Sequence, residues 1–176
     1  MSRTHILTTT LKTRDAVAAT AEYTLVHELA CSDLRRIERK DCWQVELADI
    51  PGETAGETMN RLARDTRVFV NPNKHVYEIL TPDSLETHRI GPGLFRVPVI
   101  VGNREDRKGE TACRTLAGLY GMGRHVVHVA SGVLWLLDLA ADDIVVARER
   151  ARMITETRSR REGLLANPHS DTITVF

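Results

Sequence analysis

The side chains that could do chemistry in this chain are few, and none of them completes a familiar catalytic motif. The three cysteines, Cys31, Cys42 and Cys113, include no C-x-x-C pair, so neither a disulfide framework nor a zinc ribbon is indicated. Their number and spacing fit a reducing compartment. The sequence also contains no glycine-rich phosphate loop, no H-E-x-x-H zinc motif and no G-x-S-x-G nucleophile turn.

The histidines do not assemble a metal site by spacing alone. His27 and Cys31 stand four residues apart on an expected helix, but the pattern supplies no third or fourth ligand. His125 and His128 are three apart around the expected strand at 126–130, which places them on opposite faces. Cys113 lacks an identifiable base and is expected to behave as a small buried hydrophobe. We therefore expect no metal and no catalytic residue in this chain.

Two carboxylates and two tryptophans are the remaining candidates for functional residues. Glu46 and Asp138 occupy matching positions beside apolar strand residues, where a paired-carboxylate acid–base site is conceivable. Duplication explains that match more simply. Trp43 and Trp135, the only tryptophans, either pack between paired sheets or anchor a protein interface, and packing is the simpler explanation. Together these features indicate a binding or assembly role.

The chain contains an internal duplication, which is the main clue to its architecture. Matching residues recur at nearly constant spacing in the same order along both halves. The pairs are Asn71-Pro72 with Asn167-Pro168 at an offset of 96, Trp43 with Trp135 at 92, and Asp15 with Asp106 at 91.

Each copy predicts the order strand, helix, strand, strand, helix, strand, with the two middle strands forming a hairpin. In the first copy we expect strands at 6–11, 34–39, 42–47 and 76–80, and helices from Asp15 through Leu29 and from Asp49, with Pro51 in its first turn, through Leu62. In the second copy we expect strands at 97–101, 126–130, 133–139 and 172–176, and helices at 106–119 and 143–165.

This order predicts an α+β fold of two tandem ferredoxin-like βαββαβ units with paired antiparallel sheets. The first repeat spans 1–80, a linker rich in proline and glycine spans 81–93, and the second repeat spans 94–176. A unit of this size buries little apolar area alone, so pairing of the two sheets is expected.

Composition narrows the function classes. The 176 residues include 24 Lys and Arg against 24 Asp and Glu, which argues against a nucleic-acid binder and against a polybasic membrane patch. The first residues lack a signal peptide's apolar run, and no stretch is long enough for a membrane span. We expect a cytoplasmic protein without nucleic-acid or membrane partners.

The second copy resembles the PurS family, the small subunit of phosphoribosylformylglycinamidine synthase. The resemblance rests on Asp106-x-x-Gly109-x-x-Ala112 at a helix start and on Leu164-Leu-Ala-Asn167-Pro before the last strand. Glu46 and Asp138 fall where the family's strand carries its acidic residue. The family's Gly-Lys is replaced by Gly132-Val133 and Lys40-Asp41, and Ala18 stands where the first copy would have its helix-start glycine.

The resemblance implies a non-catalytic assembly subunit in purine biosynthesis. Such a subunit bridges an ATP-dependent synthetase (PurL-type) and a glutaminase (PurQ-type) and assists ammonia transfer. The chain itself would bind no cofactor, with ATP and magnesium held by the synthetase. Family members are dimers of half this length, so a tandem chain would replace a dimer and exist as a monomer or dimer. The candidate interface or packing residues are Trp43, Trp135, Glu46, Asp138, Asp106, Gly109, Asn71 and Asn167.

Other functions fit the same residues. The chain could be a tandem ferredoxin-like regulatory module that binds a small metabolite at the seam between copies. It could be a PurS relative that serves another amidotransferase. A stand-alone enzyme that uses Glu46 or Asp138 is the third alternative.

Overall fold

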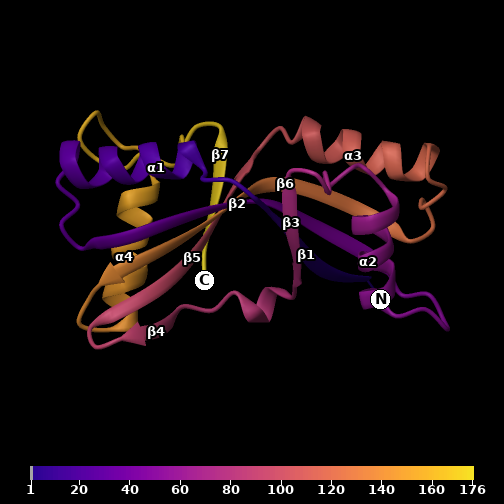
Figure 1. Ribbon diagram of the computed structural model, residues 1–176, viewed down its shortest axis with the longest axis horizontal. Helices are drawn as coiled ribbons and strands as arrows, with labels where there is room; N and C mark the ends of the chain where they lie inside the picture. The colour runs from indigo at the N-terminus through magenta and orange to yellow at the C-terminus, as the bar shows by residue number, and fades with distance from the viewer. Residues whose placement is uncertain (1) are drawn as a thin grey trace. The chain divides into compact units, whose positions relative to one another are not determined.

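A computed structural model describes residues 2–176, which form a mixed α+β fold with one antiparallel sheet of seven strands and four α-helices (Figure 1). A π-helical turn (Thr24–Glu28) extends α1, and a 3-10 turn (Pro82–Ser84) precedes β4. In chain order the elements are β1 (Ser2–Leu11), α1 (Ala16–Tyr23), β2 (Leu34–Ala48), α2 (Ala55–Asp65), β3 (His75–Leu80), β4 (His88–Gly91), β5 (Leu94–Asn103), α3 (Arg107–Gly118), β6 (Val126–Ala140), α4 (Ile144–Thr155) and β7 (Asp171–Val175).

The two middle segments of each copy form one long strand, so the two predicted hairpins are wrong. β2 and β6 each run for 15 residues without a break. A two-residue hairpin turn needs positive φ at its centre. Among the described residues with positive φ, none lies at 40–41 or 131–132, so the backbone stays extended there. The strands follow the order β3-β1-β2-β6-β5-β4, with β7 also pairing with β5.

The chain divides into two compact units that interleave the two sequence repeats. Unit 1 contains the residues up to Thr13 together with Lys40–Ser84 and Glu105–Gly132. Unit 2 contains Arg14–Arg39, Leu85–Arg104 and Val133–Phe176. Each unit therefore takes a helix and half of a long strand from the other repeat, and the units do not coincide with the repeats at 1–80 and 94–176.

The core of unit 1 joins helices from both repeats. Met59 and Leu62 come from α2 of the first repeat, and Ala112 and Leu116 come from α3 of the second. They pack on inward-facing strand residues such as Val45 of β2. Neither repeat alone supplies this core.

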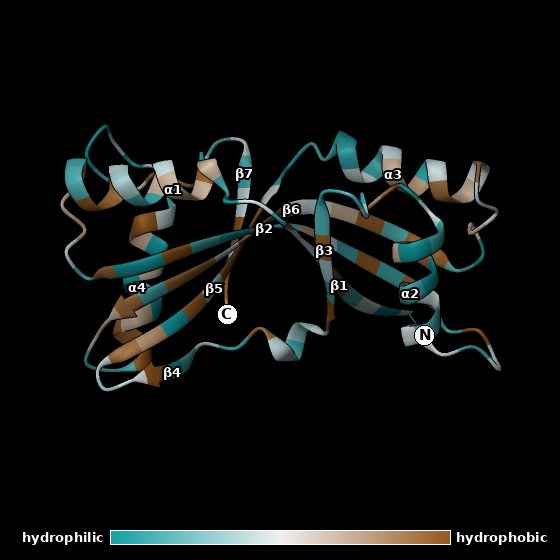
Figure 2. Cartoon of the chain, viewed as in Figure 1, coloured by the Kyte–Doolittle hydropathy of each residue, from teal (hydrophilic) through white to brown (hydrophobic). Residues whose placement is uncertain are grey.

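The core of unit 2 is built the same way from the remaining pair of helices. Ala18 and Ala21 of α1 and Ala147 and Ala151 of α4 pack with Leu137 and other apolar residues of the sheet. The small alanine side chains let these helices lie close to the strands. In unit 1, Figure 2 shows hydrophobic and hydrophilic residues alternating along the second half of β2, as one-sided burial of a strand requires.

Three helix starts, at Asp15, Asp106 and Asp143, agree with the sequence, and one does not. Asp15 caps α1 and Asp106 caps α3, as predicted. The second helix does not begin after Asp49. Instead Thr54 caps α2, with Glu57 completing a reciprocal capping box, because this pair satisfies the first backbone N–H groups better than a start at Pro51.

The last helix is shorter than the predicted 143–165. α4 begins after its cap Asp143 and ends at Thr155. All residues from 156 to 162 are polar, so no apolar face continues beyond Ile154. The chain then turns back, with Gly163 at a φ of 69° and the Leu164 backbone N–H donating to the Ile154 carbonyl.

The predicted linker at 81–93 contains regular structure. It includes the 3-10 turn and the strand β4, which pairs with β5. Gly93 lies between β4 and β5 with a φ of 60°, a conformation that glycine adopts without steric cost. In the described part of the chain, no helix has both the length and the apolar composition of a bilayer-spanning segment.

Gly109 lets α3 approach β6 closely and gives a testable prediction. A Cβ at this position would overlap the Asp106 carboxylate and the Val129 carbonyl of β6, whereas one at Gly56 of α2 would meet nothing within 4 Å. We expect Gly109→Ala to lower the free energy of unfolding by about 1–3 kcal/mol, the usual cost of overpacking. Gly56→Ala should raise it by about 0.5–1 kcal/mol through helix propensity. Urea unfolding followed by circular dichroism measures both, and equal effects would contradict the close approach.

Candidate functional site

Each tryptophan lines a cleft in its own unit. Trp43 of β2 lies in unit 1 at an open cleft of about 630 Å³, which we call the Trp43 cleft. Trp135 of β6 lies in unit 2 at one of about 530 Å³, the Trp135 cleft. The Trp43 cleft is completed by Arg67, Val68, Arg107, Lys108, Thr111, Ala112, Thr115 and Tyr120. The Trp135 cleft is completed by Ala16, Val17, Thr20, Ala21, Thr24, Leu164 and Leu165.

The two clefts are equivalent by duplication. The same face of the first helix of each repeat lines them, and matching residues are 91 positions apart. The matches are Thr20 with Thr111, Ala21 with Ala112, Thr24 with Thr115, Ala16 with Arg107, and Val17 with Lys108.

The chemistry of the two clefts differs. The Lys108 Nζ atom lies 4.5 Å from the centre of the Trp43 ring, a cation–π contact. Arg67 and Arg107 add two more cations to this lining, and none of its described residues is acidic. The described lining of the Trp135 cleft carries no charge. The matching positions of the two helices thus line one basic cleft and one apolar cleft.

Both indoles are also core residues. Trp43 is 6% exposed and Trp135 is 5% exposed, and each belongs to the apolar core of its unit. The Trp43 ring lies 4.9 Å from the Phe69 ring, centre to centre, in a tilted arrangement. The exposed edge of each indole therefore forms a rigid cleft floor.

Asp106 and Gly109 join α3 to β6. The Asp106 carboxylate accepts hydrogen bonds from the Gly109 N–H at 2.8 Å and from the Ser131 hydroxyl at 2.5 Å, and also from the Ser131 N–H. Burial alone would raise the pKa of Asp106, but the hydrogen bonds from Ser131 and Gly109 and the charge of Lys108 lower the pKa below its ordinary value. This cluster is a structural clamp.

The equivalent Asp15 has a different second partner. Its carboxylate accepts from the N–H groups of Val17 and Ala18, and the Arg39 guanidinium lies 3.3 Å away. Each aspartate thus fixes the start of its helix to the long strand of its own repeat.

The Asp106 clamp predicts a pH-dependent loss of stability. Asp106→Asn should lower the free energy of unfolding at pH 7 by about 1–2 kcal/mol, because a carboxylate that accepts three hydrogen bonds is lost. The folded-state pKa is depressed, so the carboxylate stabilises the fold above its unfolded pKa of about 3.9 and stops doing so as pH falls through the folded value.

The difference in the free energy of unfolding between Asp106→Asn and the unmodified chain should therefore become smaller below about pH 4. Urea unfolding at several pH values measures this difference, with Glu149→Gln as control, since Glu149 is an exposed carboxylate of α4. A difference independent of pH would contradict the assigned role of the carboxylate.

The two matching carboxylates are held separately. Asp138, in unit 2, accepts two hydrogen bonds from the Arg96 guanidinium, at 2.7 and 2.8 Å. Glu38 adds a second acidic contact to Arg96, at 3.4 Å. Glu46, in unit 1, accepts from the Ser2 hydroxyl. Each carboxylate therefore has a partner within its own unit.

Asn71 and Asn167 form the same turn in both repeats. The Asn71 side-chain oxygen accepts from the Asn73 N–H, and that of Asn167 accepts from the His169 N–H, both at 3.0 Å. In each case the turn leads into the last strand of the repeat, β3 or β7. The Asn-Pro element thus shapes the chain at equivalent points.

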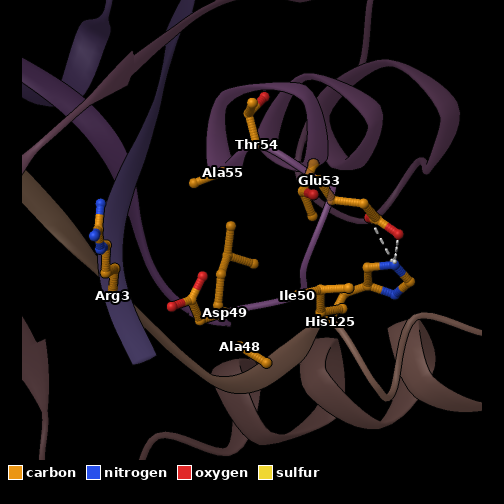
Figure 3. Close-up of a pocket in the computed structure, with 10 residues that line it drawn as sticks. Arg3, Ala48, Asp49, Ile50, Glu53, Thr54, Ala55 and His125 are labelled. Atoms are coloured by element: carbon orange, nitrogen blue, oxygen red, sulfur yellow. Dashed lines mark hydrogen bonds and ion pairs between the residues drawn. The ribbon is translucent and has the colours of Figure 1, made fainter. Parts of the chain in front are cut away.

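A polar cavity that the sequence did not indicate lies at the start of α2. Figure 3 shows the His125 ring beside Glu53, with Nε2 at 3.0 Å from the Glu53 Oε2 atom. The Arg61 guanidinium lies 3.2 Å from the same nitrogen. The cavity measures about 260 Å³, and its polar lining consists of Arg3, Asp49, Glu53, Thr54, Thr58 and His125.

No spacing signal could have found this group, because Glu53 and His125 lie 72 residues apart in different repeats. His128, considered as a possible partner of His125, is exposed on β6. Spacing along the sequence can suggest a shared site only for histidines that lie close together in the chain.

The cysteines and histidines form no metal cluster within residues 2–176. Burial raises the pKa of the Cys42 thiol to about 12 and also raises the pKa of Cys31. Thiols with raised pKa values are poor nucleophiles. The His27 ring lies beside the Tyr23 ring in a tilted arrangement, with ring centres 4.7 Å apart.

Comparison with known proteins finds no matching family model, curated protein or solved structure. Function is therefore inferred from the residues and their arrangement.

Proposed function

We propose that this chain is a PurS-like assembly subunit in which two ferredoxin-like repeats are fused in tandem. The observation that carries the proposal is the interleaving of the repeats, because each core combines one helix from each. Two copies of a single repeat that exchanged helices would produce this arrangement as a dimer. A covalent link keeps the two halves at a high effective concentration.

The residues behind the PurS resemblance support the proposal. Asp106 and Gly109 clamp α3 against β6, and Asn167 shapes the entry into β7. The first repeat has counterparts in Asp15 and Asn71. The motif residues therefore serve the architecture, which fits a subunit that contributes shape and leaves the chemistry to its partners.

The two clefts support a bridging role. A symmetric dimer offers the same surface twice, whereas this chain offers a basic Trp43 cleft and an apolar Trp135 cleft. In the proposed complex the chain holds a PurL-type synthetase and a PurQ-type glutaminase together, so that ammonia released from glutamine reaches the synthetase. ATP and magnesium act in the synthetase.

One observation favours a second function, a regulatory module that binds a small metabolite. The cavity beside His125 places Arg3 near Asp49 and Glu53, so it offers both a cation and anions to a small polar molecule. Thermal stabilisation by such a molecule would favour this function, since a ligand that binds only the folded state raises the Tm.

Reconstitution with purified partners tests the assembly role. A PurL-type synthetase and a PurQ-type glutaminase from the same source are assayed for amidation of formylglycinamide ribonucleotide with ATP and magnesium. We expect glutamine-driven turnover to need this chain and ammonia-driven turnover to proceed without it. Glutamine-driven turnover that is unchanged by the chain would overturn the proposal.

The oligomeric state gives a second test. Because the fused repeats already complete both cores, light scattering should give the mass of one chain of 19.7 kDa or of two such chains. A large homo-oligomer would contradict this expectation.

A further inference from the structure

We propose that the Trp43 cleft binds an acidic segment of a partner protein, one that carries carboxylate side chains beside apolar ones. This inference rests on the proposed assembly role and names the chemistry of one partner. It goes beyond that role because it assigns the contact to one unit and one cleft.

The charge of the cleft carries the inference. Lys108, Arg107 and Arg67 come from two separate chain segments, and no acidic residue is among the described lining. The whole chain is neutral, so three cations in one open cleft are a local concentration. The Arg107 side chain is 87% exposed, and its contact with the equally exposed Glu105 is a long 3.9 Å. Such a contact contributes little, so Arg107 remains able to pair with an incoming carboxylate.

The position of Lys108 is fixed in advance. Its ammonium group lies over the Trp43 ring, and the ring itself is held in the core against Phe69. A cation that is already ordered loses less conformational entropy when it pairs with an anion. Val68 and Ala112 supply apolar surface beside these charges, which suits a segment with alternating acidic and apolar residues.

The start of α3 argues for carboxylates of a protein segment over a free phosphate. Phosphate sites at helix starts use bare backbone N–H groups. Here the Asp106 carboxylate already accepts the Gly109 N–H, so that donor is not available to a phosphate. The cleft is also open, whereas small-ligand sites enclose most of the ligand surface.

The Trp135 cleft provides an internal comparison. Ala16 and Val17 occupy the positions of Arg107 and Lys108, while the threonines and the alanine between them are kept. The shared residues maintain the cleft, and the differing residues set its charge. The acidic segment should therefore distinguish the two units.

The two tryptophans make the experiment direct, since each reports on one cleft. Indole N–H signals of the ¹⁵N-labelled full chain are assigned with Trp43→Phe and Trp135→Phe and followed by NMR. The probe is the peptide Glu-Leu-Glu-Glu-Leu-Glu-Glu-Leu, with its Gln-for-Glu counterpart and inorganic pyrophosphate as comparisons. We expect the acidic peptide to shift the Trp43 signal, to leave the Trp135 signal in place, and to bind more weakly as salt is raised.

Matched charge variants complete the test. Arg67→Ala with Lys108→Ala should weaken peptide binding about tenfold, as the loss of two exposed charge pairs predicts. Arg160→Ala with Arg161→Ala removes the same charge from exposed positions of unit 2 and should change nothing. Lys108→Arg, which keeps the cation over the indole, should preserve binding.

Several results would overturn the inference: equal binding of the Gln peptide, an equal shift of Trp135, equal effects of the two charge variants, or pyrophosphate acting at lower concentration than the acidic peptide. Each of these leaves the reconstitution assay untouched. Glutamine-driven turnover that still needs the chain would then retain the assembly role and reject only the assigned cleft.

Discussion

The continuity of β2 and β6 is the constraint on which the rest of the structure depends. Each strand stays extended for 15 residues, so its first half lies in one unit and its second half in the other. Helix α1 therefore packs in unit 2 with α4, and α3 packs in unit 1 with α2. Both cores, both tryptophan clefts and the assignment of Glu46 and Asp138 to different units follow from these two uninterrupted strands.

The clamp at the start of α3 uses different residues from the cap at the start of α1. Gly109 lets the first turn of α3 approach the Val129 carbonyl, and Asp106 ties that turn to Ser131. The first repeat has Ala18 in place of glycine and uses Arg39 in place of serine. The architecture tolerates this change because an ion pair substitutes for the hydrogen bonds of the serine.

Elements that are determined by neighbouring side chains could be predicted from the sequence. Elements that depend on pairing between distant segments could not. The caps Asp15 and Asp106 and the Asn-Pro turns are fixed by side chains within a few residues, so they could be predicted. The supposed turns at 40–41 and 131–132 had no such side-chain chemistry, and long-range pairing kept them extended. Trp43 and Trp135 were found as candidates, but the charge of each cleft depends on helices that the fold brings to them. His125 and Glu53 share no spacing at all.

The interleaved cores also bear on how such a chain changes over generations. After an ordinary duplication each copy can drift alone, because its mutations affect only its own core. Here a buried substitution in α1 must still pack against the core that it shares with α4, which belongs to the other repeat. The two halves of the gene are therefore bound to vary together at buried positions, while exposed positions such as Lys108 and Val17 are free to diverge. This separation lets the exposed surface of each repeat change its charge while the buried positions preserve the fold.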